Sequence, residues 1–370
     1  MNLTPFPNFA YLTATITDFA FAFEKTKSGR SDLVRVSLFG QDVIPSPRFL
    51  PSLQRALRLH QSMFSFFTAQ EVFESAKSKQ LPTKVRVTVE QSQDGQLRAL
   101  GVTDPAKNVI TVQNVGELAS TMASNLTKVA YDDGVVQLYH SPGSLVGAKC
   151  AIAGEPHSYQ CQTNVPIDGI GRPSNYLAML RLVCMNGVVA WHPSFRSTIP
   201  VSKRLDDDPV PTMTRFIAAY QDENGYAALR QRLESARTTT ASLREAYQLK
   251  SFLDHEEARS LHRYSDVNQK GVSDVDTAFF ALVGRIEDLY GVTAIDALSH
   301  RRQRLSPTNA LVSDLLNFAT ELATHRAPPK MARKLNAWVG SALCGEYDLE
   351  GAPVARRDST ALYLAHSESR

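Results

Sequence analysis

The chain has 370 residues, of which 43% are hydrophobic and 21% are charged, a composition that argues against a disordered polypeptide and allows two domains. Its 40 basic and 37 acidic residues almost balance, so net charge neither requires nor excludes nucleic acid as a partner. The four cysteines do not suggest a disulfide framework, and no apolar run approaches the ~18 residues of a membrane span. We therefore expect a cytoplasmic protein with no membrane partner.

Strands are predicted where apolar and polar side chains alternate along the first half of the chain, and helices where apolar residues recur three or four positions apart. The clearest strand is KVRVTVE at 84–90, which the turn at 93–96 joins to a partner strand at 97–102. The other predicted elements are strands at 9–23, 33–40, 109–112, 134–140, 146–153 and 158–165, a helix between Leu53 and Phe73, and a helix over 115–129.

The apolar segment that follows is predicted to be a helix over 173–186. Pro173 suits the first turn of a helix, where its missing N–H costs nothing, and Gly187 suits the residue just beyond the end.

A glycine-bearing loop, Asp168–Ser174, precedes this predicted helix. The free N–H groups at a helix N-terminus can hold a phosphate, and Arg172 lies alongside. The alternative interpretation is that the two glycines serve only to turn the chain through positive φ. A dinucleotide-binding fingerprint would need a third glycine within a parallel βαβ unit, and the sequence does not supply them.

An acidic, proline-bearing linker at 206–211 separates this region from a second half whose apolar residues follow a helical period. The helices predicted there are 212–235, 238–261, 272–299, 306–325 and 330–344. We expect an α+β fold, with an antiparallel sheet and packed helices over residues 1–205, a largely helical region over 206–350 and a flexible tail over 351–370.

The cysteines and histidines raise two further alternatives, a metal site and a catalytic site within residues 150–192. Cys150 and Cys161 stand eleven positions apart, whereas paired ligands of structural zinc sites stand two to four apart, so we expect no metal. Cys161 or Cys184, with His157, is the candidate nucleophile and base, but no orienting third group or oxyanion-hole pattern accompanies them. A cleft that held Cys161, His157 and Arg172 within hydrogen-bond reach would favour this alternative. We expect no cofactor, and the interpretation leans away from an enzyme.

Basic residues near two aromatic residues form the candidate binding set. On one face of a sheet, the cationic groups would neutralise phosphates and the rings would stack on the bases of a single strand. The candidates are Arg86, Arg172, Arg181, Arg196 and Lys203 for phosphates, and Tyr159 and Trp191 for bases. An ordinary solvated surface is the alternative. A second basic group at 301–304 is either an interaction face or a complement to the dipoles of nearby helices.

Three segments resemble a family of phage- and plasmid-borne proteins of unknown function: Gly101–Asp104, Val109–Asn114, and Tyr176–Gly187 with its RLVCMNG element. The resemblance extends over roughly residues 35–340 and includes the helical part around Ser306–Asn309. It implies no catalytic residues. Because the family occurs in mobile elements, the resemblance implies work on DNA.

The leading prediction is therefore a nucleic-acid-binding protein of a mobile element that binds or anneals single-stranded DNA, with homo-oligomerisation left open. The alternative is a structural or partner-binding protein that acts through its helical half. The enzyme with a site in 150–192 is the second alternative.

Overall fold

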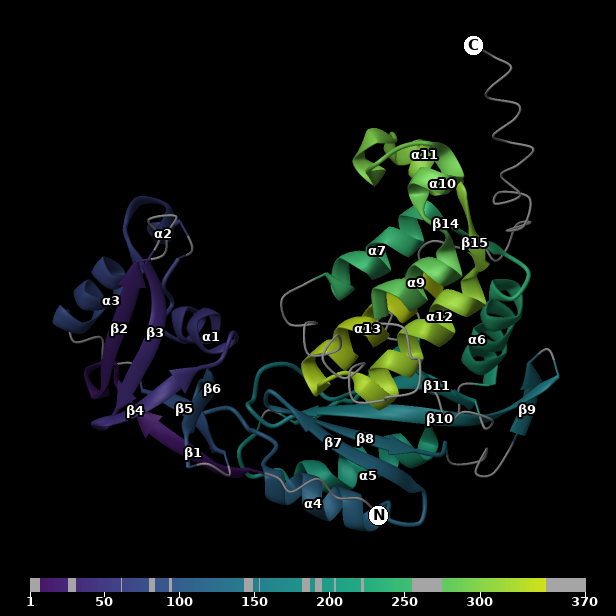
Figure 1. Ribbon diagram of the computed structural model, residues 1–370. Helices are drawn as coiled ribbons and strands as arrows, with labels where there is room; N and C mark the ends of the chain where they lie inside the picture. Colours follow the sequence, from purple (N-terminus) through teal and green to yellow (C-terminus); the bar gives the residue numbers. More distant parts are fainter. Residues whose placement is uncertain are drawn as a thin grey trace. The chain divides into compact units, whose positions relative to one another are not determined.

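The computed structural model describes residues 7–25, 31–60, 62–79, 84–92, 95–142, 149–152, 154–181, 187–189, 195–202, 204–220, 223–254 and 275–343 (Figure 1). Helices and sheets are both abundant, and the strand pairs are mostly antiparallel, so the predicted α+β fold is confirmed. Among the described residues, no helix combines the length and the apolar character needed to cross a membrane.

Two compact units make up the chain, and they are interleaved along it. The first unit contains 1–139, 163–174 and 198–219, and the second contains 140–162, 175–197 and 220–370. Strand β10 (Glu155–Pro166) contributes residues to both units. Neither unit begins or ends at residue 205, where the sequence analysis places a domain boundary.

The first unit begins with a six-stranded sheet, as counted over the described residues, whose strand order is β1-β5-β6-β4-β3-β2. All neighbours in it are antiparallel except β4 and β6, which are parallel. The strands are β1 (Asn8–Ala14), β2 (Phe19–Lys25), β3 (Ser31–Leu38), β4 (Gln41–Pro45), β5 (Val85–Gln91) and β6 (Leu97–Thr103).

Three helices accompany this sheet, namely α1 (Phe49–Ala56), α2 (Met63–Phe66) and α3 (Ala69–Ser78). Their buried residues Phe49, Leu53 and Phe73 join the sheet in one apolar core. Successive side chains of a strand point to opposite faces of the sheet. The alternation predicted for β5 therefore directs Val85, Val87 and Val89 into this core.

A second core in the first unit lies under α4 (Val112–Thr121) and α5 (Pro209–Ala219). These helices pack with β7 (Leu126–Asp132), β8 (Val135–His140) and the last residues of β10. Residue 139 is the last residue of β8 that belongs to this unit.

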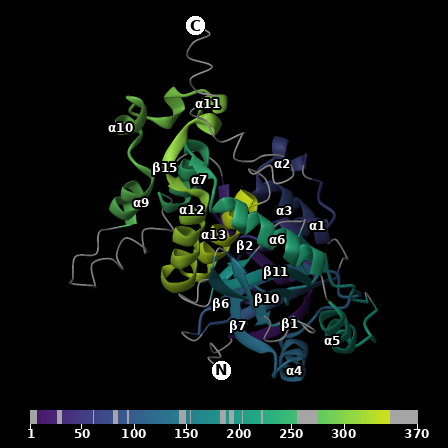
Figure 2. The same cartoon turned by 90° about the vertical axis from the view of Figure 1, so that its right-hand side faces the viewer.

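The second unit combines strands with most of the helices. Figures 1 and 2 show α6, α12 and α13 over β10 and β11, with Leu229, Leu315 and Trp338 in the shared core. Its further strands are β9 (Lys149–Ile152), β11 (Ser174–Arg181), β12 (Gly187–Val189), β13 (Arg196–Thr198), β14 (Thr240–Ser242) and β15 (Pro307–Leu311). Its helices are α6 (Glu223–Ala236), α7 (Leu243–Leu253), α9 (Val275–Val283), α10 (Ile286–Tyr290), α11 (His300–Leu305), α12 (Val312–Glu321) and α13 (Pro329–Ser341).

The helix predicted over 173–186 is wrong, because residues 174–181 form the strand β11. Gly187, predicted to end that helix, instead begins β12 and pairs with Leu180. Leu177, Ala178 and Met179 are all buried, so both faces of the strand are covered. A strand covered on both faces is a continuous apolar run, and periodicity cannot distinguish such a run from a buried helix.

Other predicted elements need smaller corrections. Residues 109–112 are not a strand, since Thr111 caps α4 by accepting a hydrogen bond from the backbone N–H of Asn114. The helix predicted over 115–129 ends at Thr121, and β7 follows. Each of the helices predicted over 238–261 and 306–325 begins with a short strand, β14 or β15, and these two strands pair with each other.

Candidate functional site

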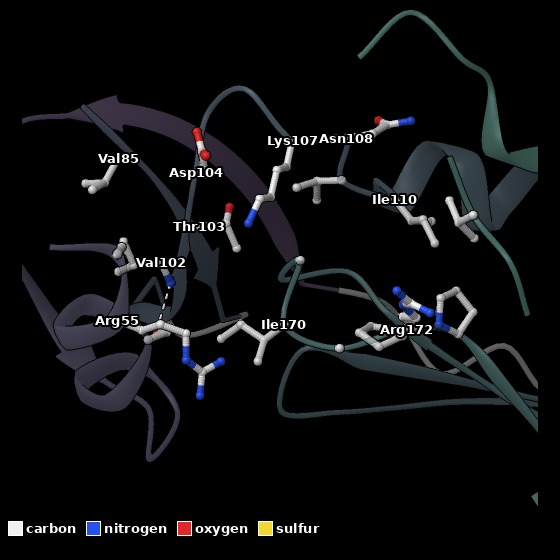
Figure 3. A pocket seen from close by; sticks show the side chains of 18 of the residues that line it. Arg55, Val85, Val102, Thr103, Asp104, Lys107, Asn108, Ile110, Ile170 and Arg172 are labelled. Carbon is white, nitrogen blue, oxygen red and sulfur yellow. Dashed lines mark hydrogen bonds between the residues drawn. The ribbon is translucent and has the colours of Figure 1, made fainter. Parts of the chain in front are cut away.

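A cavity of about 560 Å³ opens in the first unit, and all of its lining residues belong to that unit (Figure 3). Its walls come from the end of α1, the beginning of β5, the end of β6, the turn at 104–110 and the loop at 166–173. Segments that are distant in the sequence therefore form one concave surface, which we call the cationic pocket.

Among the described residues, five cationic side chains line this pocket, together with a single carboxylate, that of Asp104. The five are Arg55, Arg58, Lys84, Lys107 and Arg172, and all of them are exposed. Within the described part of the chain, none of the five makes an ion pair. The pocket thus presents positive charge that the protein itself does not neutralise, and this arrangement favours an anionic ligand.

Figure 3 shows the arrangement of three of these cations. The amino group of Lys107 lies beside Thr103, while Arg55 and Arg172 come from opposite sides of the pocket. The hydroxyl oxygen of Thr103 is buried and has no hydrogen-bond partner among the described residues. A buried hydroxyl without a partner is costly in a folded protein.

Arg58 occupies a strained backbone position just beyond the end of α1. Its φ is +56°, in the left-handed region that favours glycine, and the N–H of Leu59 bonds back to the carbonyl of Gln54 at 2.9 Å. This is a glycine-favoured helix end, and a residue with a Cβ costs about 1–2 kcal/mol in that conformation. An exposed arginine therefore stands in the pocket at a position where local stability favours glycine.

The loop at 168–173 has its glycines for structural reasons. Gly169 has a φ of +73°, and a Cβ there would lie 2.9 Å from side-chain carbons of Thr103 and Val109. Because β11 and not a helix follows, the loop has no helix dipole to offer a phosphate, and that interpretation of the sequence is wrong. The loop acts as a wall of the pocket and carries Arg172.

A network of ion pairs holds the loop at 168–173 in place. Asp168 is fully buried, its carboxylate lies 3.0 Å from Arg48, and its other oxygen accepts the N–H of Ile170 at 2.9 Å. Arg48 also lies 3.6 Å from Asp133, which forms a 2.8 Å ion pair with Arg98. The network therefore joins the start of α1, strand β6, the β7–β8 turn and the glycine loop.

Burial dominates the electrostatics of Asp168. It raises the pKa of this carboxyl group to about 6, and the nearby Arg48 only partly opposes the rise. At the other end of the network, Glu90 pairs with Arg98 at 2.8 Å and accepts a hydrogen bond from the Tyr131 hydroxyl. Burial and the charge of Glu90 both raise the pKa of Tyr131, so that hydroxyl stays protonated.

The structure describes the side chains of four of the seven predicted binding residues, and two of these lie in each unit. Arg172 lies in the cationic pocket. Arg86 belongs to the same unit, but its guanidinium donates hydrogen bonds to the carbonyls of Pro105 and Lys107, both at 2.7 Å. Its role there is to hold the turn from which Lys107 extends.

Two further predicted binding residues, Arg196 and Tyr159, do not line the pocket. In the second unit, Arg196 lies over the ring of Tyr176 at 5.8 Å, and Tyr159 meets Tyr226 edge-on at 4.9 Å. The side chain of Arg181, together with Lys203 and Trp191, falls outside the described residues. Of the four candidates whose side chains the structure describes, only Arg172 lines the pocket.

The enzyme alternative finds no support in the pair Cys161 and His157, and Cys184, the other candidate nucleophile, lies outside the described residues. Cys161 and His157 are four residues apart on β10, a separation of about 13 Å along a strand, which is beyond proton-transfer reach. The buried Cys161 thiol contacts the Tyr226 hydroxyl at 3.1 Å, and His157 Nδ1 faces the carbonyl of Glu155 at 2.9 Å. The described residues contain no group of three His, Cys, Asp or Glu side chains suited to a metal ion.

Sequence reasoning missed Arg55, Arg58 and Lys107. Arg55 lies in the last turn of α1 and Arg58 just beyond its end, where basic residues normally complement the helix dipole. Lys107 lies in an ordinary turn after Pro105. No local pattern marks these residues, because only the packing of α1 beside β6 brings them together.

Comparisons with known proteins found no match to this chain among protein-family models, curated proteins or solved structures.

Proposed function

We propose that this chain is a nucleic-acid-binding protein that contacts phosphates through the cationic pocket. The observation that carries the proposal is the convergence of five cations, none paired with a carboxylate among the described residues, around a single acidic side chain. Phosphate contacts made by lysine and arginine provide most of the affinity of proteins that bind nucleic acid without base readout.

The size of the charge cluster sets the expected salt dependence. Each phosphate neutralised on a single strand contributes about 0.7 to the slope of log affinity against log salt concentration. Five contacts would give a slope of about −3.5. A fluorescent single-stranded oligonucleotide, titrated with the purified full chain over a salt series, measures this slope directly.

Removing three of the pocket charges tests the assignment. The triple variant Arg55→Gln, Lys107→Gln, Arg172→Gln is expected to weaken binding about 100-fold at 0.1 M salt and to reduce the slope by about 2. A matched control removes the same charge from Arg215, Arg302 and Arg304, which are exposed and lie outside the pocket.

Equal losses in the two triple variants would contradict the pocket as the binding site. If the unmodified chain does not bind the oligonucleotide even at low salt, the proposed function fails. Attention would then move to protein partners of the helical region.

Arg58 gives a second test, in which stability and binding change in opposite directions. Arg58→Gly is expected to raise the free energy of unfolding by about 0.5–1 kcal/mol, because relief of the left-handed strain exceeds the extra unfolded-state entropy of glycine. The same change is expected to weaken oligonucleotide binding about fivefold at 0.1 M salt through the loss of one phosphate contact. Urea unfolding and the binding titration measure the two effects.

Phe39→Gly is the control for Arg58→Gly, since Phe39 also has a positive φ, +50°, but lies outside the pocket. It should gain stability without any change in binding. An Arg58→Gly variant that binds as tightly as the unmodified chain would remove Arg58 from the ligand contacts.

A further inference from the structure

A group of exposed apolar side chains follows α1 in the first unit. Phe66 is 83% exposed and Phe67 is 56% exposed, and Met63 beside them is also exposed. Soluble proteins rarely leave neighbouring large apolar side chains in water unless the patch binds something. We call Phe66 and Phe67 the aromatic pair.

The backbone beneath this pair is held in place. Phe64 packs on the buried ring of Phe73 with a centroid distance of 6.3 Å, which ties α2 to the core of the unit. Directly after Phe67, the side chain of Thr68 caps α3 and bonds to Glu71. Two rings on a fixed backbone lose little conformational entropy on binding, which favours a contact surface.

The aromatic pair and the cationic pocket complement each other chemically. No described residue that lines the pocket is aromatic, so the pocket can contact phosphates but offers no aromatic ring on which a base could stack. Arg58, at the edge of the pocket, lies only eight residues before Phe66, which limits their separation to about 29 Å. An extended nucleic-acid strand of a few nucleotides spans such a distance.

We propose that Phe66 and Phe67 form a stacking surface for unpaired bases, so that the first unit prefers single-stranded to duplex nucleic acid. The inference rests on the proposed function, because the pocket supplies the phosphate contacts. Aromatic faces bind any base that is free of its partner, whereas the bases of a duplex are already stacked on one another. The aromatic pair takes the role that the sequence predicted for Tyr159 and Trp191.

The double variant Phe66→Ala, Phe67→Ala tests this inference against two oligonucleotides of equal length, one with bases and one abasic. The unmodified chain should bind the base-bearing strand more tightly. The variant should lose about 10- to 100-fold in affinity for that strand and lose little for the abasic one. Its salt slope should not change, because the phosphate contacts remain.

Phe39→Ala is the control, since Phe39 is a 53% exposed aromatic residue of the same unit that belongs to neither the pocket nor the pair. It should bind both strands as the unmodified chain does. Thermal unfolding of all three proteins should give equal midpoints, because the replaced rings are exposed.

The possible outcomes separate the two proposals. If the double variant binds the base-bearing strand normally while the pocket triple variant does not, the stacking inference is wrong and the proposed function stands. Equal losses on the base-bearing and abasic strands would also overturn stacking. A chain that binds neither strand would overturn the proposed function itself.

Discussion

Arg48→Met is expected to lower the free energy of unfolding by about 3 to 5 kcal/mol at pH 8. The substitution leaves the fully buried carboxylate of Asp168 without its cation, and an unpaired buried charge is among the most costly defects in a folded protein. Methionine preserves most of the apolar stem of the arginine, so lost packing contributes little. Urea unfolding at pH 8 measures the change.

The loss should be smaller at pH 5. There Asp168 can take up a proton in the variant, which removes the unpaired charge. The control is Arg35→Met, which removes an arginine from a 3.7 Å pair with Asp42 in which both side chains are about two-thirds exposed. Such surface pairs contribute about 0 to 1 kcal/mol. Equal losses in the two variants would show that the buried network does not carry the stability assigned to it.

The same substitution should also weaken oligonucleotide binding, although Arg48 does not line the pocket. Asp168 holds the N–H of Ile170, and Ile170 and Arg172 form one wall of the pocket. Arg48 is therefore a positioning residue. Its effect on binding should be larger at pH 8 than at pH 5, whereas the pocket triple variant should be equally weak at both.

Asp168→Asn is expected to remove a pH dependence from the stability of the protein. Burial raises the pKa of Asp168 to about 6 in the folded protein, from 3.8 in a solvated chain, so the folded state binds this proton more tightly. The resulting stabilisation is complete below about pH 4 and is lost as the pH rises to about 6. A shift of this size corresponds to about 2–3 kcal/mol.

The measurement compares urea unfolding of the unmodified chain and of Asp168→Asn between pH 4 and pH 8. The stability of the unmodified chain relative to the variant should fall by about 2–3 kcal/mol over this range. Asp18 and Glu71, whose pKa values are lowered by hydrogen bonds at helix N-termini, titrate in both proteins and cancel in the difference. Parallel stability curves would show that Asp168 keeps an ordinary pKa in the folded protein.

Local patterns were sufficient to predict many individual elements. The alternation at 84–90 and the turn after it correctly predicted β5 and β6, because strand burial has a period of two and a tight turn fixes the pairing. The α+β class follows from the same patterns. Strand β11 was predicted as a helix because burial on both faces removes the period that distinguishes a strand from a helix.

Sequence reasoning could predict a residue of the candidate site only where the neighbouring residues in the sequence were unusual. Arg172 follows two glycines in a loop, and this context marks it in the sequence. Asp168, two positions before Ile170, looks like an ordinary loop carboxylate until its burial against Arg48 is known.

The sequence by itself determined the strand alternation at 84–90 and the α+β class, since each depends on neighbours a few positions apart. Tertiary structure alone decided the cationic pocket and the network behind it. The parallel pairing of β4 with β6 and the packing of α1 beside β6 bring Arg55 and Arg58 to the pocket that Lys107 and Arg172 share. Long-range packing sets these distances, and it leaves no period or spacing in the sequence from which they can be predicted.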